Sequence, residues 1–157
     1  MPHLIVTPLS RLQEIAEAHE ANRIVTLINS ATLVERPRHV PEQDHLFLGF
    51  NDIVEPQEGM ILPAAQHVLD LFAFAQSWDR QSPMIIHCYA GVSRSTAGAY
   101  MTSLLLNPDQ DETDLALELR RAFNPNGDPV WFKSVSSLLN QLSLLTIVLT
   151  GAAMLRE

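Results

Sequence analysis

The sequence predicts an α/β fold: a central mixed, largely parallel sheet of about four or five strands flanked by helices, with a helical C-terminal half. Two observations predict it. Short runs rich in β-branched residues alternate with longer segments of helical period, and after the last such run the pattern is helical only. The 157 residues contain no internal repeat and no low-complexity segment, so we expect a single domain over 1–157.

Four runs are predicted to be strands. The second and fourth are apolar enough to be buried on both faces, as strands inside a parallel sheet are. Proline or glycine interrupts the segments 30–44 and 51–62, which are predicted to be loops. The predicted strands are 3–7, 23–29, 45–50 and 83–88.

Helical periodicity predicts four helices over 8–21, 63–78, 95–106 and 111–123. Ser10 and Gln13 have the spacing of a capping box, and Pro63 suits the first turn of its helix. The helix over 63–78 is apolar around most of its circumference, which predicts that it lies between the sheet and a neighbour. The helix over 111–123 has acids in its first turn and arginines in its last, which matches the helix dipole.

Composition excludes several classes of partner. Apolar residues make up 46% of the chain and charged residues 18%, which is typical of a globular protein. The net charge is -8 and Lys133 is the single lysine, so neither nucleic acid nor a membrane surface is an expected partner. The N-terminus is too short and proline-rich for a secretory signal, which predicts a cytoplasmic protein.

No metal and no cofactor are expected. The chain has one cysteine, Cys88, which excludes an internal disulfide and every metal motif built on cysteine pairs. None of the histidines pairs with another at the spacing of metal ligands. Five of the six are therefore predicted to be surface or capping residues: His3, His19, His39, His45 and His67.

The stretch "MIIHCYAGVSRSTAGAY", residues 84–100, carries the chemistry. A buried strand brings Cys88 to a turn, and a helix begins just beyond, so backbone N–H groups and the helix dipole form a cradle for an anion. Gly91 permits the tight path, and the guanidinium of Arg94 can hold two phosphate oxygens at once. A thiol in such a cradle should ionise easily and attack phosphorus. The stretch therefore predicts the nucleophile of a phosphate-transfer enzyme.

"HCYAGVSRS" matches His-Cys-x5-Arg-Ser/Thr, the signature of cysteine-dependent protein phosphatases. From the first strand to about residue 140, the chain resembles their compact dual-specificity-like branch, and most closely small bacterial proteins described as predicted tyrosine phosphatases. The resemblance implies that Cys88 forms a phosphocysteine and that His87 helps the thiol to ionise. It also implies that Arg94 clamps the phosphoryl oxygens and that Ser95 stabilises the departing thiolate. The backbone N–H groups implied to bind phosphate belong to Tyr89, Ala90, Gly91, Val92, Ser93 and Arg94.

The family also needs an aspartic acid on a separate upstream loop. Asp52, in "GFNDIVEP", matches best because it follows a strand and opens an irregular segment. Asp44 is the alternative, but it precedes the same strand and should lie at its other end. "RRAFNPNGDPVWF" resembles the family's later arginine- and proline-rich turn, with Asn124 in place of the usual proline, and Asn126 is predicted to support the active-site loops.

Several alternatives remain open. The substrate is a phosphotyrosine-type protein, or else a phosphoinositide or another small phosphate ester. Tyr89, Ala90 and Val92 occupy positions where enzymes for highly charged substrates place lysines, which argues against such substrates. A non-catalytic phosphate-binding module is a third reading, and sulfur transfer or arsenate reduction a fourth, although arsenate reduction would usually need further cysteines. Cys88 as an ordinary buried thiol is the structural alternative.

Two further segments have competing interpretations. Arg36 and Arg38 could form a rim for substrate, but a solvated loop is the better interpretation. The run 138–155 approaches the length of a membrane span, which needs about 20 predominantly apolar residues, yet polar side chains interrupt it. We expect a core helix that also covers a self-association surface, which would make the chain a homo-oligomer.

Overall fold

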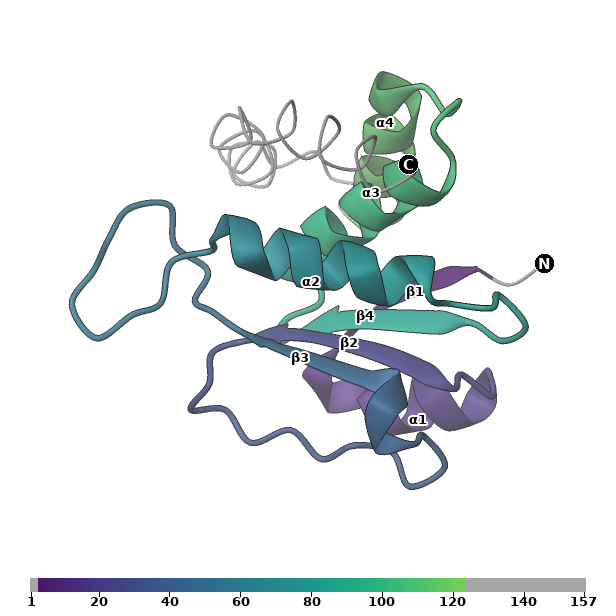
Figure 1. The fold of residues 1–157 in the computed structure, drawn as a ribbon, viewed down its shortest axis with the longest axis horizontal. Helices are drawn as coiled ribbons and strands as arrows, with labels where there is room; N and C mark the ends of the chain where they lie inside the picture. The colour runs from purple at the N-terminus through teal and green to yellow at the C-terminus, as the bar shows by residue number, and fades with distance from the viewer. Residues whose placement is uncertain (1–2, 124–157) are drawn as a thin grey trace.

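The computed structural model describes residues 3–123. It contains four strands in the order β1-β4-β2-β3, and every neighbouring pair is parallel (Figure 1). The prediction of a largely parallel α/β sheet is therefore confirmed, and so is each predicted strand. The strands are β1 (Leu4–Pro8), β2 (Arg23–Ile28), β3 (His45–Gly49) and β4 (Met84–Cys88).

Helices cover both faces of this sheet. Figure 1 shows α1 on one face and α2 and α3 on the other, with α4 beside α3. A 3-10 turn, Leu9–Arg11, precedes α1, and a second, Glu42–Asp44, precedes β3. The helices are α1 (Leu12–Ala18), α2 (Ala65–Gln76), α3 (Arg94–Leu106) and α4 (Glu112–Phe123).

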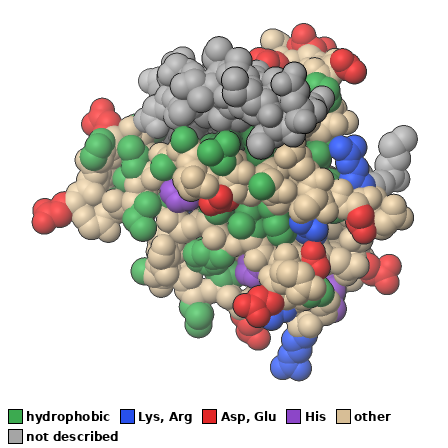
Figure 2. All heavy atoms as spheres, in the orientation of Figure 1, with side chains coloured by type: hydrophobic (Ala, Val, Ile, Leu, Met, Phe, Trp, Pro, Cys, Tyr) green, Lys and Arg blue, Asp and Glu red, His purple; other side chains and the backbone are tan. Residues whose placement is uncertain are grey.

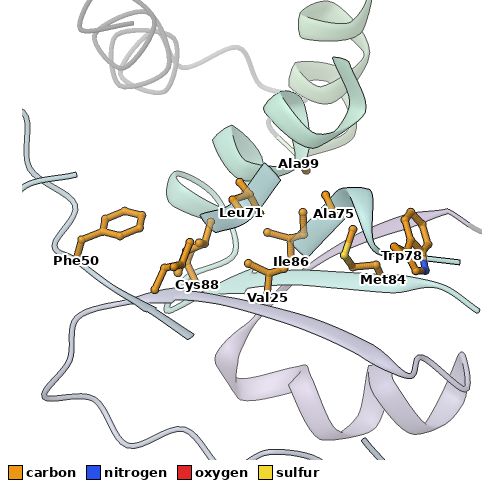
Figure 3. Close-up of a cluster of buried hydrophobic side chains, with 11 residues drawn as sticks. Val25, Phe50, Leu71, Ala75, Trp78, Met84, Ile86, Cys88 and Ala99 are labelled. Atoms are coloured by element: carbon orange, nitrogen blue, oxygen red, sulfur yellow. The ribbon is translucent and has the colours of Figure 1, made fainter. Parts of the chain in front are cut away.

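The alternation of side chains along the strands divides the core into two clusters. On the α1 face, Ile24 and Ile85 pack with Leu12 and Ala16. On the other face, residues of β2, β3 and β4 pack against α2 and α3, and Figure 3 draws the eleven buried residues of this cluster and labels nine of them. Cys88 belongs to this second cluster and, in that view, lies between Phe50 and the remaining members. The single thiol is thus at one end of the larger core.

Two details of the predicted helices are wrong. Ser10 and Gln13 form no capping box, because the chain first makes a 3-10 turn and α1 begins only at Leu12. The Gln13 amide instead donates to the carbonyl of Glu35 at 2.7 Å. Pro63 lies just before α2 rather than in its first turn, since Ala64 is still extended.

The predictions for Asn124, Asn126 and the run 138–155 lie outside the described residues. Over 3–123, no helix is both long and apolar enough to cross a bilayer. On the face shown in Figure 2, acidic side chains outnumber basic ones at the visible surface, in keeping with the net charge of -8.

Close packing of α3 on the sheet depends on Gly98. A Cβ there would lie 2.6 Å from Cδ1 of Leu27 and 3.2 Å from Cγ2 of Ile86. We expect Gly98→Val to lower the free energy of unfolding by about 1–3 kcal/mol, the usual cost of overpacking. Ala73→Val, on an exposed position of α2, is the control and should change it by less than about 0.5 kcal/mol. Equal urea midpoints for the two variants would contradict this packing.

Candidate active site

The loop after β4 is held against the end of β1. Gly91 has a φ of 71°, and a Cβ there would lie 2.6 Å from the backbone nitrogen of Pro8 and 2.8 Å from the carbonyl carbon of Thr7. A hydrogen bond of 3.2 Å from Leu9 N–H to the carbonyl of Tyr89 fixes the other side of the loop. Only glycine fits here, because both the left-handed φ and the close backbone exclude a side chain.

Cys88 lies at the bottom of this loop, where β4 ends and just before α3 begins. The residue is buried, with 2% of its surface exposed. Sγ accepts a hydrogen bond of 3.2 Å from the N–H of Gly91 and lies 3.2 Å from Oγ of Ser95. Both groups can donate a hydrogen bond to the sulfur. Ser95, which the resemblance places in contact with the chemistry of Cys88, thus lies beside it.

Arg94 is the first residue of α3, and its side chain is buried, with 9% of the residue exposed. Nη1 donates to the carbonyl of Phe50 at 3.0 Å, which links α3 to the segment after β3. Nε is also buried and has no hydrogen-bonding partner among the described residues. A buried guanidinium with an unused donor is costly unless an acceptor is supplied, and an anionic ligand can supply one.

Asp52 is held over the same loop. Asn51 closes the segment that carries it, because its N–H donates to the carbonyl of Ile61 at 2.8 Å and its Oδ1 accepts from the N–H of Ile61 at 2.9 Å. Ser93 Oγ then donates to Oδ1 of Asp52 at 3.0 Å. The Asp52 carboxyl group is thus tied to the loop that begins at Cys88.

Asp44 lies elsewhere. It precedes β3 and forms a 3.1 Å ion pair with Arg23, the first residue of β2. Since the strands are parallel, this is the edge of the sheet opposite to Cys88. Of the two candidate acids, the structure brings only Asp52 to the cysteine loop.

His87 is fully buried on the α1 face of β4, and its Nε2 lies 2.6 Å from Oγ1 of Thr26. Burial lowers the pKa of His87 to about 4; the backbone of Cys88 acts to raise that pKa, and His45 acts to lower it. His87 is therefore uncharged at neutral pH. Any help that it gives to the thiol passes through hydrogen bonds rather than through a positive charge.

Two of the other histidines have defined roles. His67 caps α2 as predicted, since its Nδ1 accepts from the N–H of Ala64 at 3.0 Å. His45 was expected to be a surface or capping residue, and this is wrong. It is half-buried, with Nε2 2.7 Å from Oγ1 of Thr26, and burial, followed by the charge of Arg36, lowers the pKa of His45. Thr26 was not among the predicted site residues, because nothing in β2 alone marks it.

The outer surface of the loop is apolar. Tyr89 is 66% exposed and Val92 39%, while Ala90 is also exposed between them.

Arg38 is exposed, whereas Arg36 is half-buried. The guanidinium of Arg36 donates to the carbonyl of Val40, so Arg36 is engaged within its own loop. Within 3–123, no three His, Cys, Asp or Glu side chains gather as a metal site would require.

Solved structures share this fold. Human DUSP28 matches with a TM-score of 0.61 at 13% identity, covering 92% of this chain and 96% of that one. The PTP-2 phosphatase of Cydia pomonella matches with a TM-score of 0.60 at 20% identity, over 85% and 83% of the two chains. The human tyrosine phosphatase-like serine/threonine/tyrosine-interacting protein matches with a TM-score of 0.59 at 16% identity, over 91% and 93%. The chain therefore has the fold of the dual-specificity and protein tyrosine phosphatases.

Sequence comparison adds a different likeness. No protein-family model matches the chain. A stretch of 49 residues is 49% identical to the inner membrane transport permease YhhJ of Escherichia coli K12, and equally to that of Shigella flexneri. The stretch is 31% of this chain but only 13% of the permease. The match covers too little of the permease to indicate that the two proteins share an activity.

The lowered pKa of His87 makes the stability of the fold depend on pH. The unfolded ring, with its ordinary pKa of 6.5, binds a proton more readily than the folded ring at about 4. Above pH 6.5 the ring is uncharged in both states, and the free energy of unfolding does not depend on it. As the pH falls from 6.5 towards 4, the unfolded state takes up the proton first, so the free energy of unfolding decreases by up to about 3 kcal/mol. Urea unfolding of wild type from pH 7 to 4.5 should show that slope, and His87→Gln should flatten it. The exposed His19→Gln is the control; a His87→Gln slope equal to that of wild type would refute the assignment.

Proposed function

We propose that this chain is a phosphatase that hydrolyses phosphate monoesters through a phosphocysteine on Cys88. The observation that carries the proposal is the arrangement around Sγ: the Gly91 N–H and the Ser95 hydroxyl face the sulfur, and Asp52 is tied to the same loop. An anion above the thiol would be bound by the N–H groups of 89–94 and by Arg94. Attack by the thiolate forms the S–P bond while the ester oxygen leaves.

Asp52 is proposed as the general acid and base. An ester oxygen that leaves as an alkoxide or phenoxide needs a proton, which a carboxylic acid can supply. The carboxylate then takes a proton from the water that hydrolyses the phosphocysteine, and the Ser95 hydroxyl stabilises the thiolate as it departs. The hydrogen bond that Ser93 donates to Asp52 supports this role, because it keeps the Asp52 carboxyl beside the loop.

The proposed substrate is a phosphotyrosine-type protein. The exposed loop residues Tyr89 and Val92, together with the exposed Val54, offer apolar contacts to an aromatic ring. The nearby segment also exposes Glu55 and Glu58, which would repel a substrate with several phosphates. This favours phosphotyrosine over a phosphoinositide.

The remaining parts of the proposal are a single domain over 1–157, a cytoplasmic location and self-association through 138–155.

Cys88→Ser tests the covalent step. Turnover of an aryl phosphate should fall by about 10³-fold or more, the scale of losing a nucleophile. Binding of inorganic phosphate, followed by calorimetry, should persist because the amides and Arg94 remain, whereas Arg94→Ala should lose it. Residual turnover of a few per cent in Cys88→Ser would exclude a phosphocysteine. Phosphate binding without turnover in wild type would point to a non-catalytic binding module.

Asp52→Ala tests the general acid. We expect a loss of about 10²–10⁴-fold on phosphotyrosine, the usual contribution of one acid–base group. The loss should shrink for aryl phosphates whose phenol is acidic, because such a phenol leaves without a proton. Wild type should have a bell-shaped pH–rate profile, since Cys88 must be ionised and Asp52 protonated together.

Asp44→Ala is the matched control for this series. Its carboxylate pairs with Arg23 at the opposite edge of the sheet, so turnover should change little. A uniform loss across the phenol series for Asp52→Ala, or a graded loss for Asp44→Ala, would overturn the assignment. Comparing phosphotyrosine peptides with phosphoinositides on wild type then separates the two substrate classes.

A further inference from the structure

Three polar side chains from adjacent strands form a chain beneath the cysteine loop. Oγ1 of Thr26 lies 2.6 Å from Nε2 of His87 and 2.7 Å from Nε2 of His45. The register explains the contacts: Thr26 of β2 stands opposite His87 of β4, and His45 of β3 stands opposite Ile24, two residues earlier on the same face. Thr26 and His87 are fully buried, so no water competes for these bonds from solvent.

The two ring nitrogens of His87 have different surroundings. Nδ1 is buried and has no hydrogen-bonding partner among the described residues. Nε2 lies within hydrogen-bonding distance of the Thr26 hydroxyl. Thr26 is therefore the side chain that fixes the orientation of the His87 ring.

The Thr26 hydroxyl can donate one hydrogen bond and accept another, so it can bond both histidines at once. The charged side chain that acts on His45 from its surroundings is Arg36, while the adjacent Asp44 is already paired with Arg23. Thr26 thus links His45 of β3 to His87 of β4.

We infer that Thr26 and His45 are positioning residues for the nucleophile: their hydrogen bonds fix the His87 ring and the β4 backbone beside it, and so hold the cysteine loop in which the N–H of Gly91 faces Sγ of Cys88. His87 and Cys88 point to opposite faces of β4, so the influence passes through the backbone that joins them. The inference concerns the reactivity of the thiol, and it rests on the proposed function only for its consequence in catalysis.

The test is the rate at which iodoacetamide alkylates Cys88, measured against pH on the full chain. Cys88 is the single cysteine, so the modification is unambiguous. Thr26→Val keeps the shape of the side chain and removes the hydroxyl. The midpoint of its pH profile should rise by about one unit, which is about a tenfold loss of rate below the midpoint. Thr26→Ser restores the hydroxyl and should return the wild-type profile.

His45 gives a second, independent variant pair. His45→Gln keeps a side chain that can hydrogen-bond to Thr26 and should resemble wild type, whereas His45→Leu removes that hydrogen bond and should shift the profile in the direction of Thr26→Val. The control is Thr7→Val. Thr7 also stands opposite His87, from β1, and is buried, but its hydroxyl bonds the carbonyl of Pro8 at 3.4 Å instead. Its profile should match wild type.

Folded variants whose profiles all coincide with wild type would overturn the inference, and so would an equal shift in Thr7→Val. If Thr26→Val fails to fold, His45→Leu against His45→Gln decides the question alone. Alkylation needs no phosphate ester. A protein that turns over no ester but shows the shift would refute the proposed function and support this inference, while normal turnover with no shift would do the reverse.

Discussion

The arrangement of the site depends on the pairing of β4 with a parallel strand on each side. β1 and β2 hold β4 in register over its length, which places His87 between Thr7 and Thr26 and Cys88 beside Pro8. The carboxyl ends of parallel strands meet at one edge of a sheet, and ligands commonly bind there. The cysteine loop and the segment carrying Asp52 leave the sheet at that edge, so Asp52 and Ser93, which are 41 positions apart in sequence, become neighbours by topology.

The same pairing gives the two faces of β4 different tasks. Cys88 and Ile86 point into the core beneath α2 and α3, whereas His87 and Ile85 point towards α1. Cys88 is thereby part of an apolar cluster, while its sulfur contacts the N–H of Gly91 in the loop and the hydroxyl of Ser95 in α3. Gly91 makes this possible, since the loop could not approach β1 so closely with a side chain at that position.

Much of this could be predicted from the sequence, because the signals are local. A β-branched run of five residues, a glycine at a fixed offset from a cysteine and an arginine at the start of a helix each appear within one short window. The four strands, and the choice of Asp52 rather than Asp44 as the candidate acid, follow from such windows. The Thr26–His45–His87 contacts could not be predicted, because they require the register between three strands. His45 also looks like any loop-flanking histidine until β3 is paired with β2. The failed capping box at Ser10 has a similar cause: the 3-10 turn that displaces it follows from how β1 joins the first helix.

The hydrogen bond between Ser93 and Asp52 has a consequence for the timing of events at the site. Many enzymes leave the acid-bearing segment open and close it around the ligand, so part of the binding energy is used to order that segment. Here Asn51 closes the base of the segment and Ser93 donates to the carboxyl of Asp52, so both contacts come from the chain itself. On the proposed mechanism, the cost of ordering the segment that carries Asp52 is therefore met during folding rather than by the binding of substrate. On the same proposal, substrates would be distinguished by their contacts with the exposed Tyr89 and Val92 rather than by closure of the segment around them.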